Sequence, residues 1–174
     1  GGNTFVGNLT LVNSGSRYIM TGNGTFDTFQ ANVNLINSGT SNIYLAHNGA
    51  GHIISGDLTA TNSAIGTGAC QILIANSNTA TLTVNGNTTI NHDGSATTLR
   101  TYFGDQGDIS QVGNLSITNA GTGTTSDIRV ANNANSLITI TGNTSVVNSN
   151  TATTTNRIYL GNQGDIIFNG TLDI

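Results

Sequence analysis

Short runs of alternating apolar and polar residues follow one another along the whole chain and recur at nearly constant intervals. The clearest run, residues 7–15, reads Gly-Asn-Leu-Thr-Leu-Val-Asn-Ser-Gly. Related runs begin at Ala31, Gly56, Gly86, Gly113, Gly142 and Gly170. The spacings between starts are 24, 25, 30, 27, 29 and 28 residues, and a nearly fixed period of this size is typical of repeat architectures.

Two further runs lie between successive starts, for example residues 43–45 (Ile-Tyr-Leu) and residues 82–84 (Leu-Thr-Val). Each run is short, rich in β-branched residues and bounded by Gly, Asn or Ser, which is typical of strands and not of helices. The sequence therefore predicts an all-β fold: a single β-solenoid, or β-helix, over residues 1–174. We expect about six coils of roughly 27 residues with three short strands per coil. The chirality of β connections favours a right-handed coil.

Alternation in the first strand of each coil assigns its side chains to the interior or to solvent. The outward position is polar throughout: Thr10, Asn34, Thr59, Thr89, Ser116, Ser145 and Asp173. The predicted inward pairs are Leu9/Leu11, Val33/Leu35, Leu58/Ala60, Thr88/Ile90, Leu115/Ile117, Thr144/Val146 and Leu172/Ile174. A shift of one residue would turn this apolar set to solvent, so the register is strongly specified.

One corner of each coil carries an amide side chain. The residues at this position are Asn13, Asn37, Asn62, Asn119 and Asn148, with His92 in the remaining coil. Asn tolerates left-handed turn geometry, and stacked amides can form a hydrogen-bonded ladder. We interpret these residues as a structural Asn ladder.

The composition and net charge limit the classes of partner that the chain is expected to bind. Of 174 residues, 92 are Gly, Asn, Thr or Ser, and the charged residues are four Arg and eight Asp, without Lys or Glu. A net charge of -4 offers no basic footprint for nucleic acid, and no apolar run approaches the roughly 20 residues of a membrane helix. We therefore expect neither nucleic-acid binding nor membrane insertion.

Candidate catalytic groups are scattered. His47, His52 and His92 fall at different repeat positions, and the Asp residues fall mostly in turns. Metal binding or acid–base catalysis needs such groups to converge within a few ångströms. We expect no enzyme activity, no catalytic residue, no metal and no cofactor. Cys70 has no partner for an internal disulfide and is interpreted as a small buried hydrophobe.

The outward side of the second strand is the most informative surface. Its central position is apolar, aromatic or basic in every coil: Ile19, Tyr44, Leu73, Tyr102, Arg129 and Tyr159. The preceding outward position runs Arg17, Asn42, Gln71, Arg100, Asp127 and Arg157. Tyr and Arg are enriched at binding hot spots, and an apolar patch on a polar surface often marks a partner. The competing interpretation is a cross-coil side-chain ladder that only stabilises the sheet.

Both ends of the array fall within a repeat, at residues 4–6 and 172–174, without an atypical capping segment. Uncapped solenoid ends expose unpaired strand edges. We expect the array to belong to a longer chain or to a polymer, so that the partner is flanking repeats of the same chain or another copy bound end to end or laterally.

The Gly-Asn-Leu-Thr-x-x-Asn-Ser-Gly units, which cover essentially the whole chain, resemble the β-strand repeats of large secreted bacterial surface proteins. They are similar to the stalks of filamentous-haemagglutinin-type adhesins and of autotransporter passengers, although the coils here are longer and more variable. The resemblance implies an extracellular or cell-surface location and a structural or adhesive role.

The resulting expectation is a structural component of an extracellular bacterial filament or adhesin stalk. The first alternative is a carbohydrate-binding adhesin module in which the Tyr and Arg residues on the outward side of the second strand contact a cell-surface glycan. A less favoured alternative is an ice-binding solenoid, which requires an outward Thr-x-Thr pair in every coil. Only Thr59 and Thr61 form such a pair on the first strands, with Ser116 and Thr118 close to one.

Overall fold

The computed structural model describes residues 1–151 and 154–174, which form twenty β-strands arranged in three parallel sheets. Sheet A contains β1 (Thr4–Phe5), β4 (Thr28–Phe29), β7 (His52–Ile54), β10 (Thr81–Val84), β13 (Asp108–Gln111), β16 (Leu137–Ile140) and β19 (Asp165–Phe168). Sheet B contains β2 (Leu9–Asn13), β5 (Val33–Asn37), β8 (Leu58–Asn62), β11 (Thr88–His92), β14 (Leu115–Asn119), β17 (Thr144–Asn148) and β20 (Leu172–Asp173). Sheet C contains β3 (Ile19–Met20), β6 (Ile43–Leu45), β9 (Ala69–Ile74), β12 (Thr98–Phe103), β15 (Thr125–Val130) and β18 (Thr155–Leu160).

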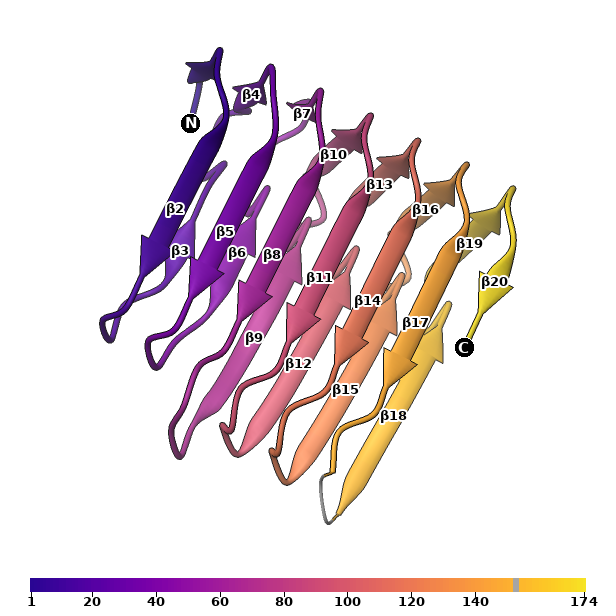
Figure 1. Ribbon diagram of the computed structural model, residues 1–174. Coiled ribbons are helices and arrows are strands. Elements are labelled where there is room, and N and C mark those ends of the chain that lie inside the picture. The colour runs from indigo at the N-terminus through magenta and orange to yellow at the C-terminus, as the bar shows by residue number, and fades with distance from the viewer. Residues whose placement is uncertain (152–153) are drawn as a thin grey trace.

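Successive strands belong to different sheets, so the chain winds as a solenoid and each strand pairs with the equivalent strand of the next coil. In Figure 1 the chain descends through sheet B in front, returns upward through sheet C behind and advances from left to right, which is a right-handed coil. The predicted β-solenoid of about six coils with three strands each is confirmed.

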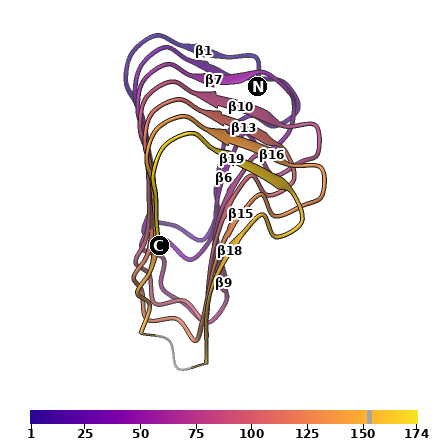
Figure 2. The ribbon, with the colours of Figure 1, turned by 90° about the vertical axis from the view of Figure 1, so that its right-hand side faces the viewer.

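Pairing in sheet B gives the coil lengths directly. Aligned residues are 24, 25, 30, 27, 29 and 28 positions apart from one coil to the next. The five-residue strands of sheet B keep their length from β2 to β17, whereas the strands of sheet C grow from two residues in β3 to six in β9 and beyond. Seen down the axis, the cross-section accordingly enlarges toward the C-terminal coils (Figure 2).

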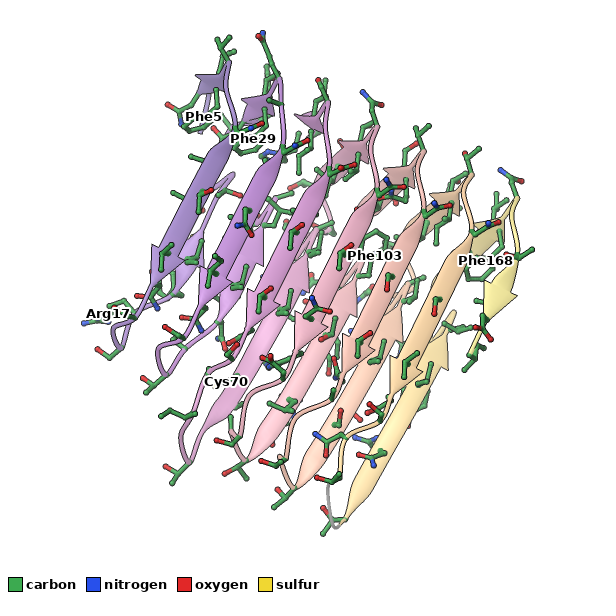
Figure 3. The ribbon with its side chains drawn as sticks, viewed as in Figure 1. Phe5, Arg17, Phe29, Cys70, Phe103 and Phe168 are labelled. Atoms are coloured by element: carbon green, nitrogen blue, oxygen red, sulfur yellow. The ribbon has the colours of Figure 1, made fainter. Side chains whose placement is uncertain are left out.

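The interior is one continuous stack of apolar side chains. The core cluster runs through successive coils and includes Phe29, Leu35, Ile90 and Phe103, which are almost completely buried. Phe5 and Phe29 stack with their ring centroids 5.0 Å apart, and Figure 3 shows them side by side at the N-terminal end. The inward positions assigned to β5, β8, β11 and β14 are buried, as predicted.

A smaller apolar cluster lies apart from the main core and contains Ala64, Cys70, Ala96 and Leu99. Cys70 is 1% exposed, which confirms its interpretation as a small buried hydrophobe, and burial raises the pKa of its thiol. Figure 3 places it well below the phenylalanine residues.

Candidate interaction surface

The outward face of sheet C gathers the residues that the sequence singled out. Strand pairing aligns Tyr44, Leu73, Tyr102, Arg129 and Tyr159 in one row along the axis. A neighbouring row contains Gln71, Arg100, Asp127 and Arg157. We call these nine residues the sheet C face.

Arg129 lies in the C-terminal part of this face, between two tyrosine rings. Its guanidinium carbon is 5.1 Å from the ring centroid of Tyr102 and 5.1 Å from that of Tyr159. Arg157 lies 5.7 Å from the centroid of Tyr159. A guanidinium within about 6 Å of a ring centroid is attracted by the negative face of the ring. These rings therefore offer a face to a neighbouring coil, which is the geometry of a stabilising cross-coil ladder.

Asp127 neutralises part of the positive charge on this face. Arg157 holds its carboxylate in a two-point pair, with Nε–Oδ1 and Nη2–Oδ2 distances of 2.6 and 2.7 Å. Arg129 approaches the same carboxylate at 3.6 Å. Because the Asp127 side chain is almost fully buried, this bidentate pairing satisfies a charge that would otherwise be costly. Strand pairing aligns Arg100, Asp127 and Arg157, so the charges of this row alternate in sign along the axis.

Arg100 differs from its neighbours. Within the described part of the chain its guanidinium takes part in no hydrogen bond or ion pair, although its Nε, like that of Arg129, is buried without a partner. Tyr102, on the same strand, is half-buried, and burial raises the pKa of its phenol, although Arg129 and Arg100 oppose that shift. Among the described residues, Arg100 is thus the arginine of the sheet C face without a hydrogen-bonded or ion-paired partner.

The N-terminal part of the predicted stripe is wrong by one residue. Ile19 aligns with Ile43 and is 6% exposed, so it points into the core, and Met20 takes the place beside Tyr44. Arg17 precedes β3 and falls outside the paired rows. The cause is that β3 has only two residues, so a three-residue apolar run does not fix which side chains face inward.

Leu73 is also less accessible than predicted. It lies in the outward row but is only 7% exposed, since its neighbours in the row are the large rings of Tyr44 and Tyr102. The contiguous exposed stripe expected from the sequence is therefore divided into an N-terminal part around Tyr44 and a C-terminal part around Arg129. At the N-terminal part, Tyr18 meets Tyr44 edge-on at 5.6 Å, and His47 meets it at 5.2 Å.

The Asn ladder is direct in the first three coils. Asn13 donates from Nδ2 to Oδ1 of Asn37 at 2.6 Å, and Asn37 donates in the same way to Asn62 at 2.9 Å. Each of these amides also binds its own turn; for example, the backbone N–H of Ala64 donates to Oδ1 of Asn62. This part of the predicted ladder is confirmed.

His92 interrupts the ladder in the fourth coil. It aligns with Asn62 and Asn119 but is fully buried, and its Nδ1 lies 3.3 Å from Oγ1 of Thr101. That hydroxyl donates its proton to Oδ1 of Asn119, so Nδ1 must be the protonated nitrogen of the ring. Nε2 is then a buried acceptor with no partner.

Hydroxyl groups of sheet C continue the chain of hydrogen bonds beyond His92. Asn119 donates from Nδ2 to Oγ of Ser126, and Ser126 donates to Oδ1 of Asn148. The predicted Asn119 and Asn148 are thus linked through Ser126 and not directly. Burial of the His92 ring, only partly opposed by Asp93, lowers its pKa from 6.5 to about 4.

A longer ladder, which the sequence reasoning missed, runs along the corner that precedes sheet B. In every coil a side-chain oxygen accepts the backbone N–H of the aligned residue one coil further on. The accepting residues are Asn8, Asn32, Asp57, Asn87, Asn114 and Asn143. The signal was present in the sequence, since these residues are the Asn or Asp of the repeated Gly-Asn-Leu-Thr unit.

From Gly56 on, close packing between coils requires the Gly of the same unit, whereas the second unit has Ala31 there. A Cβ atom on Gly113 would lie 2.3 Å from the carbonyl oxygen of Gly86, and one on Gly86 would lie 2.5 Å from that of Gly56. Real Cβ atoms do not approach backbone so closely, so a side chain here would push the coils apart. The N-terminal member, Gly7, has nothing within 4 Å.

A second missed feature is the turn after sheet C. The residue that follows each strand from β6 to β18 has a positive φ, and three of these residues are alanines: Ala46 (50°), Ala75 (52°) and Ala131 (54°). The next residue is His, Asn or Asp, and these side chains pair across coils; Asn132 donates to Asp105 and accepts from Asn162. Burial raises the pKa of Asp105, although this hydrogen bond and Arg129 oppose the shift.

A cavity of about 340 Å³ opens at the N-terminal end of the solenoid. Phe5, Leu9 and Leu11 line its apolar wall, and Asp27 lies at its polar side. Asp27 accepts hydrogen bonds from Asn3 and Gly22, which outweigh the effect of burial and lower its pKa. These hydrogen bonds satisfy the Asp27 carboxylate, which therefore needs no ligand. We interpret the cavity as the uncovered end of the apolar interior.

Across residues 1–151 and 154–174, no group of three or more His, Cys, Asp or Glu side chains is placed to hold a metal ion. Over the same ranges, no helix has the length and apolar character needed to cross a membrane. No protein-family model matches the chain, and neither a curated protein nor a solved structure is significantly similar to it.

Proposed function

We propose that the chain is a non-catalytic structural rod, a segment of an extracellular bacterial filament or adhesin stalk. The observation that carries this proposal is the unbroken axial stacking: three parallel sheets keep their register through all the described coils. Side-chain ladders reinforce the corners between these sheets. A solenoid in which every coil hydrogen-bonds to its neighbours is stiff along its axis.

The extracellular location is supported by the sequence. Short polar residues dominate, Lys and Glu are absent, and the repeat unit resembles those of secreted bacterial surface proteins.

The glycan-binding alternative finds less support in the geometry of the sheet C face. Stacking on a sugar needs a free aromatic face, whereas Tyr102 and Tyr159 each turn a face toward the guanidinium of Arg129. Tyr44 is engaged by Tyr18 and His47. The ladder interpretation accounts for these contacts without a ligand.

The direct test is single-molecule pulling of the chain, held by its two ends next to a reference immunoglobulin domain. A tension-carrying rod should unfold at a force no lower than the reference domain. It should extend in steps of one coil, about 90 Å for 27 residues at roughly 3.4 Å per residue. Unfolding well below the reference force, without coil-sized steps, would contradict the structural role.

A further inference from the structure

Charge is distributed unevenly around the solenoid. Arg100, Arg129 and Arg157 lie on the sheet C face. Arg157 pairs with the almost fully buried Asp127 carboxylate but keeps 40% of its side chain exposed. Sheet A carries Asp108 on β13 and Asp165 on β19. One side of the molecule is therefore basic and another is acidic, although the whole chain is acidic.

The spacing of these charges is the same on both sheets. Arg100 and Arg157 share one row, separated by the single strand that holds Asp127. Asp108 and Asp165 share a row of sheet A, separated by Leu137. Each pair is two coils apart, roughly 10 Å at the usual distance between paired strands.

The two patterns also start in the same coil. Arg100 on β12 is followed directly by Asp108 on β13, and Arg157 on β18 by Asp165 on β19. Between and beside the acidic groups, sheet A exposes Leu137 (44%) and Ile167 (47%), which are large apolar side chains on an otherwise polar surface. A complementary surface would carry arginines two coils apart with aromatic groups beside them, and the sheet C face has this composition.

We propose that the sheet C face of one copy binds sheet A of a second copy. The two solenoids then lie parallel and in the same axial register. Arg100 faces Asp108 of the second copy, Arg157 faces Asp165 of the second copy, and the tyrosine edges meet Leu137 and Ile167. This lateral contact rests on the proposed function as a filament component and specifies its partner.

The contact uses different surfaces on the two partners, so each bound copy leaves one face free for another. Heterologous contacts of this kind continue until they close on themselves. Sheets A and C are not opposite each other in the cross-section (Figure 2), so repeated contact would curve. Lateral assembly of rods into a curved bundle follows.

Charge reversal tests the pairing. Sedimentation velocity in low salt should show concentration-dependent association of the wild-type chain, which weakens at about 1 M salt, where the Debye length is about 3 Å. Arg100→Asp alone and Asp108→Arg alone should each weaken association at least about ten-fold by placing like charges together. An equimolar mixture of the two variants should associate again, because each supplies the charge that the other lacks.

Arg17→Asp is the matched control, because it makes the same charge change outside the proposed contact and should leave association unchanged. Circular dichroism and thermal melting of each variant establish that the rod is intact. Failure of the mixture to recover association, with intact variants, overturns the lateral contact and leaves the rod function standing. A wild-type chain that remains monomeric but binds polygalacturonate assigns the face to an acidic polysaccharide and also overturns the proposal.

Discussion

Replacing His92 by Asn should complete the amide ladder that His92 interrupts. The aligned residues in the adjacent coils are Asn62 and Asn119. Gly94 follows His92 by two residues, as Ala64 follows Asn62, so its N–H is the donor equivalent to the Ala64 N–H that binds Asn62 Oδ1. A buried nitrogen without a partner destabilises the fold by about 1–3 kcal/mol, and the substitution removes this nitrogen. It also adds one or two hydrogen bonds. The smaller side chain leaves a void that costs on the order of 1 kcal/mol. We expect a net gain of about 1 kcal/mol at pH 7.

The sharper prediction concerns pH. The pKa of His92 falls from 6.5 in the unfolded chain to about 4 in the fold, so between these values the unfolded state binds the extra proton. Stability of the wild type therefore falls as pH decreases from about 6.5 to 4, and this contribution is absent from His92→Asn. Between pH 7 and pH 5 the difference between variant and wild type should grow by about 2 kcal/mol.

Urea unfolding of both proteins at pH 7, 6 and 5 measures this difference. A change of about 2 kcal/mol corresponds to roughly 4–8 °C in Tm for a chain of this size. His47→Asn makes the same replacement at a partly exposed ring and provides the matched control. A difference between His92→Asn and wild type that stays constant over this pH range would refute the buried, neutral state of His92.

Three further outcomes follow from the same contacts. Ala131→Gly, at a φ of 54°, should be neutral or stabilising by up to about 1 kcal/mol in chemical unfolding, where Ala→Gly in a strand or helix normally destabilises. Gly113→Ala should destabilise by at least about 2 kcal/mol because of the backbone contact, whereas Gly7→Ala, with open space, should not; equal effects would contradict the coil spacing. Asn114→Ala should cost about 1 kcal/mol by removing the acceptor for the Asn143 N–H, as measured by urea unfolding.

Sheet B could be predicted residue by residue from the sequence. From β2 to β17 its strands have five residues with a polar second position between two inward residues, as in Leu58-Thr59-Ala60, so only one register buries the apolar set. The Asn at the end of five of these strands marked the corner, and the direct bonds among Asn13, Asn37 and Asn62 follow from that register. The repeat period alone was sufficient for the solenoid.

The side-chain orientations of sheet C could be predicted less accurately than those of sheet B. Its first strand is too short to show alternation, which led to the wrong orientation of Ile19. Cross-sheet contacts also carry no periodic signal: the hydroxyls of Thr101 and Ser126 enter the ladder because two sheets meet at that corner. Burial of Leu73 depends on the size of the side chains in adjacent coils, which alternation does not report.

The most direct test of the account is a set of distances along the solenoid axis between spin labels, measured by pulsed electron paramagnetic resonance. Spin labels on cysteines replacing Thr10 and, in turn, Thr89, Ser116 or Ser145 sample one outward row of sheet B in a Cys70→Ser background. The row predicts distances that rise linearly, by about 4.8 Å per coil, from roughly 14 Å to roughly 24 Å. Distances that do not increase with coil number would contradict the stacked solenoid on which the proposed rod depends.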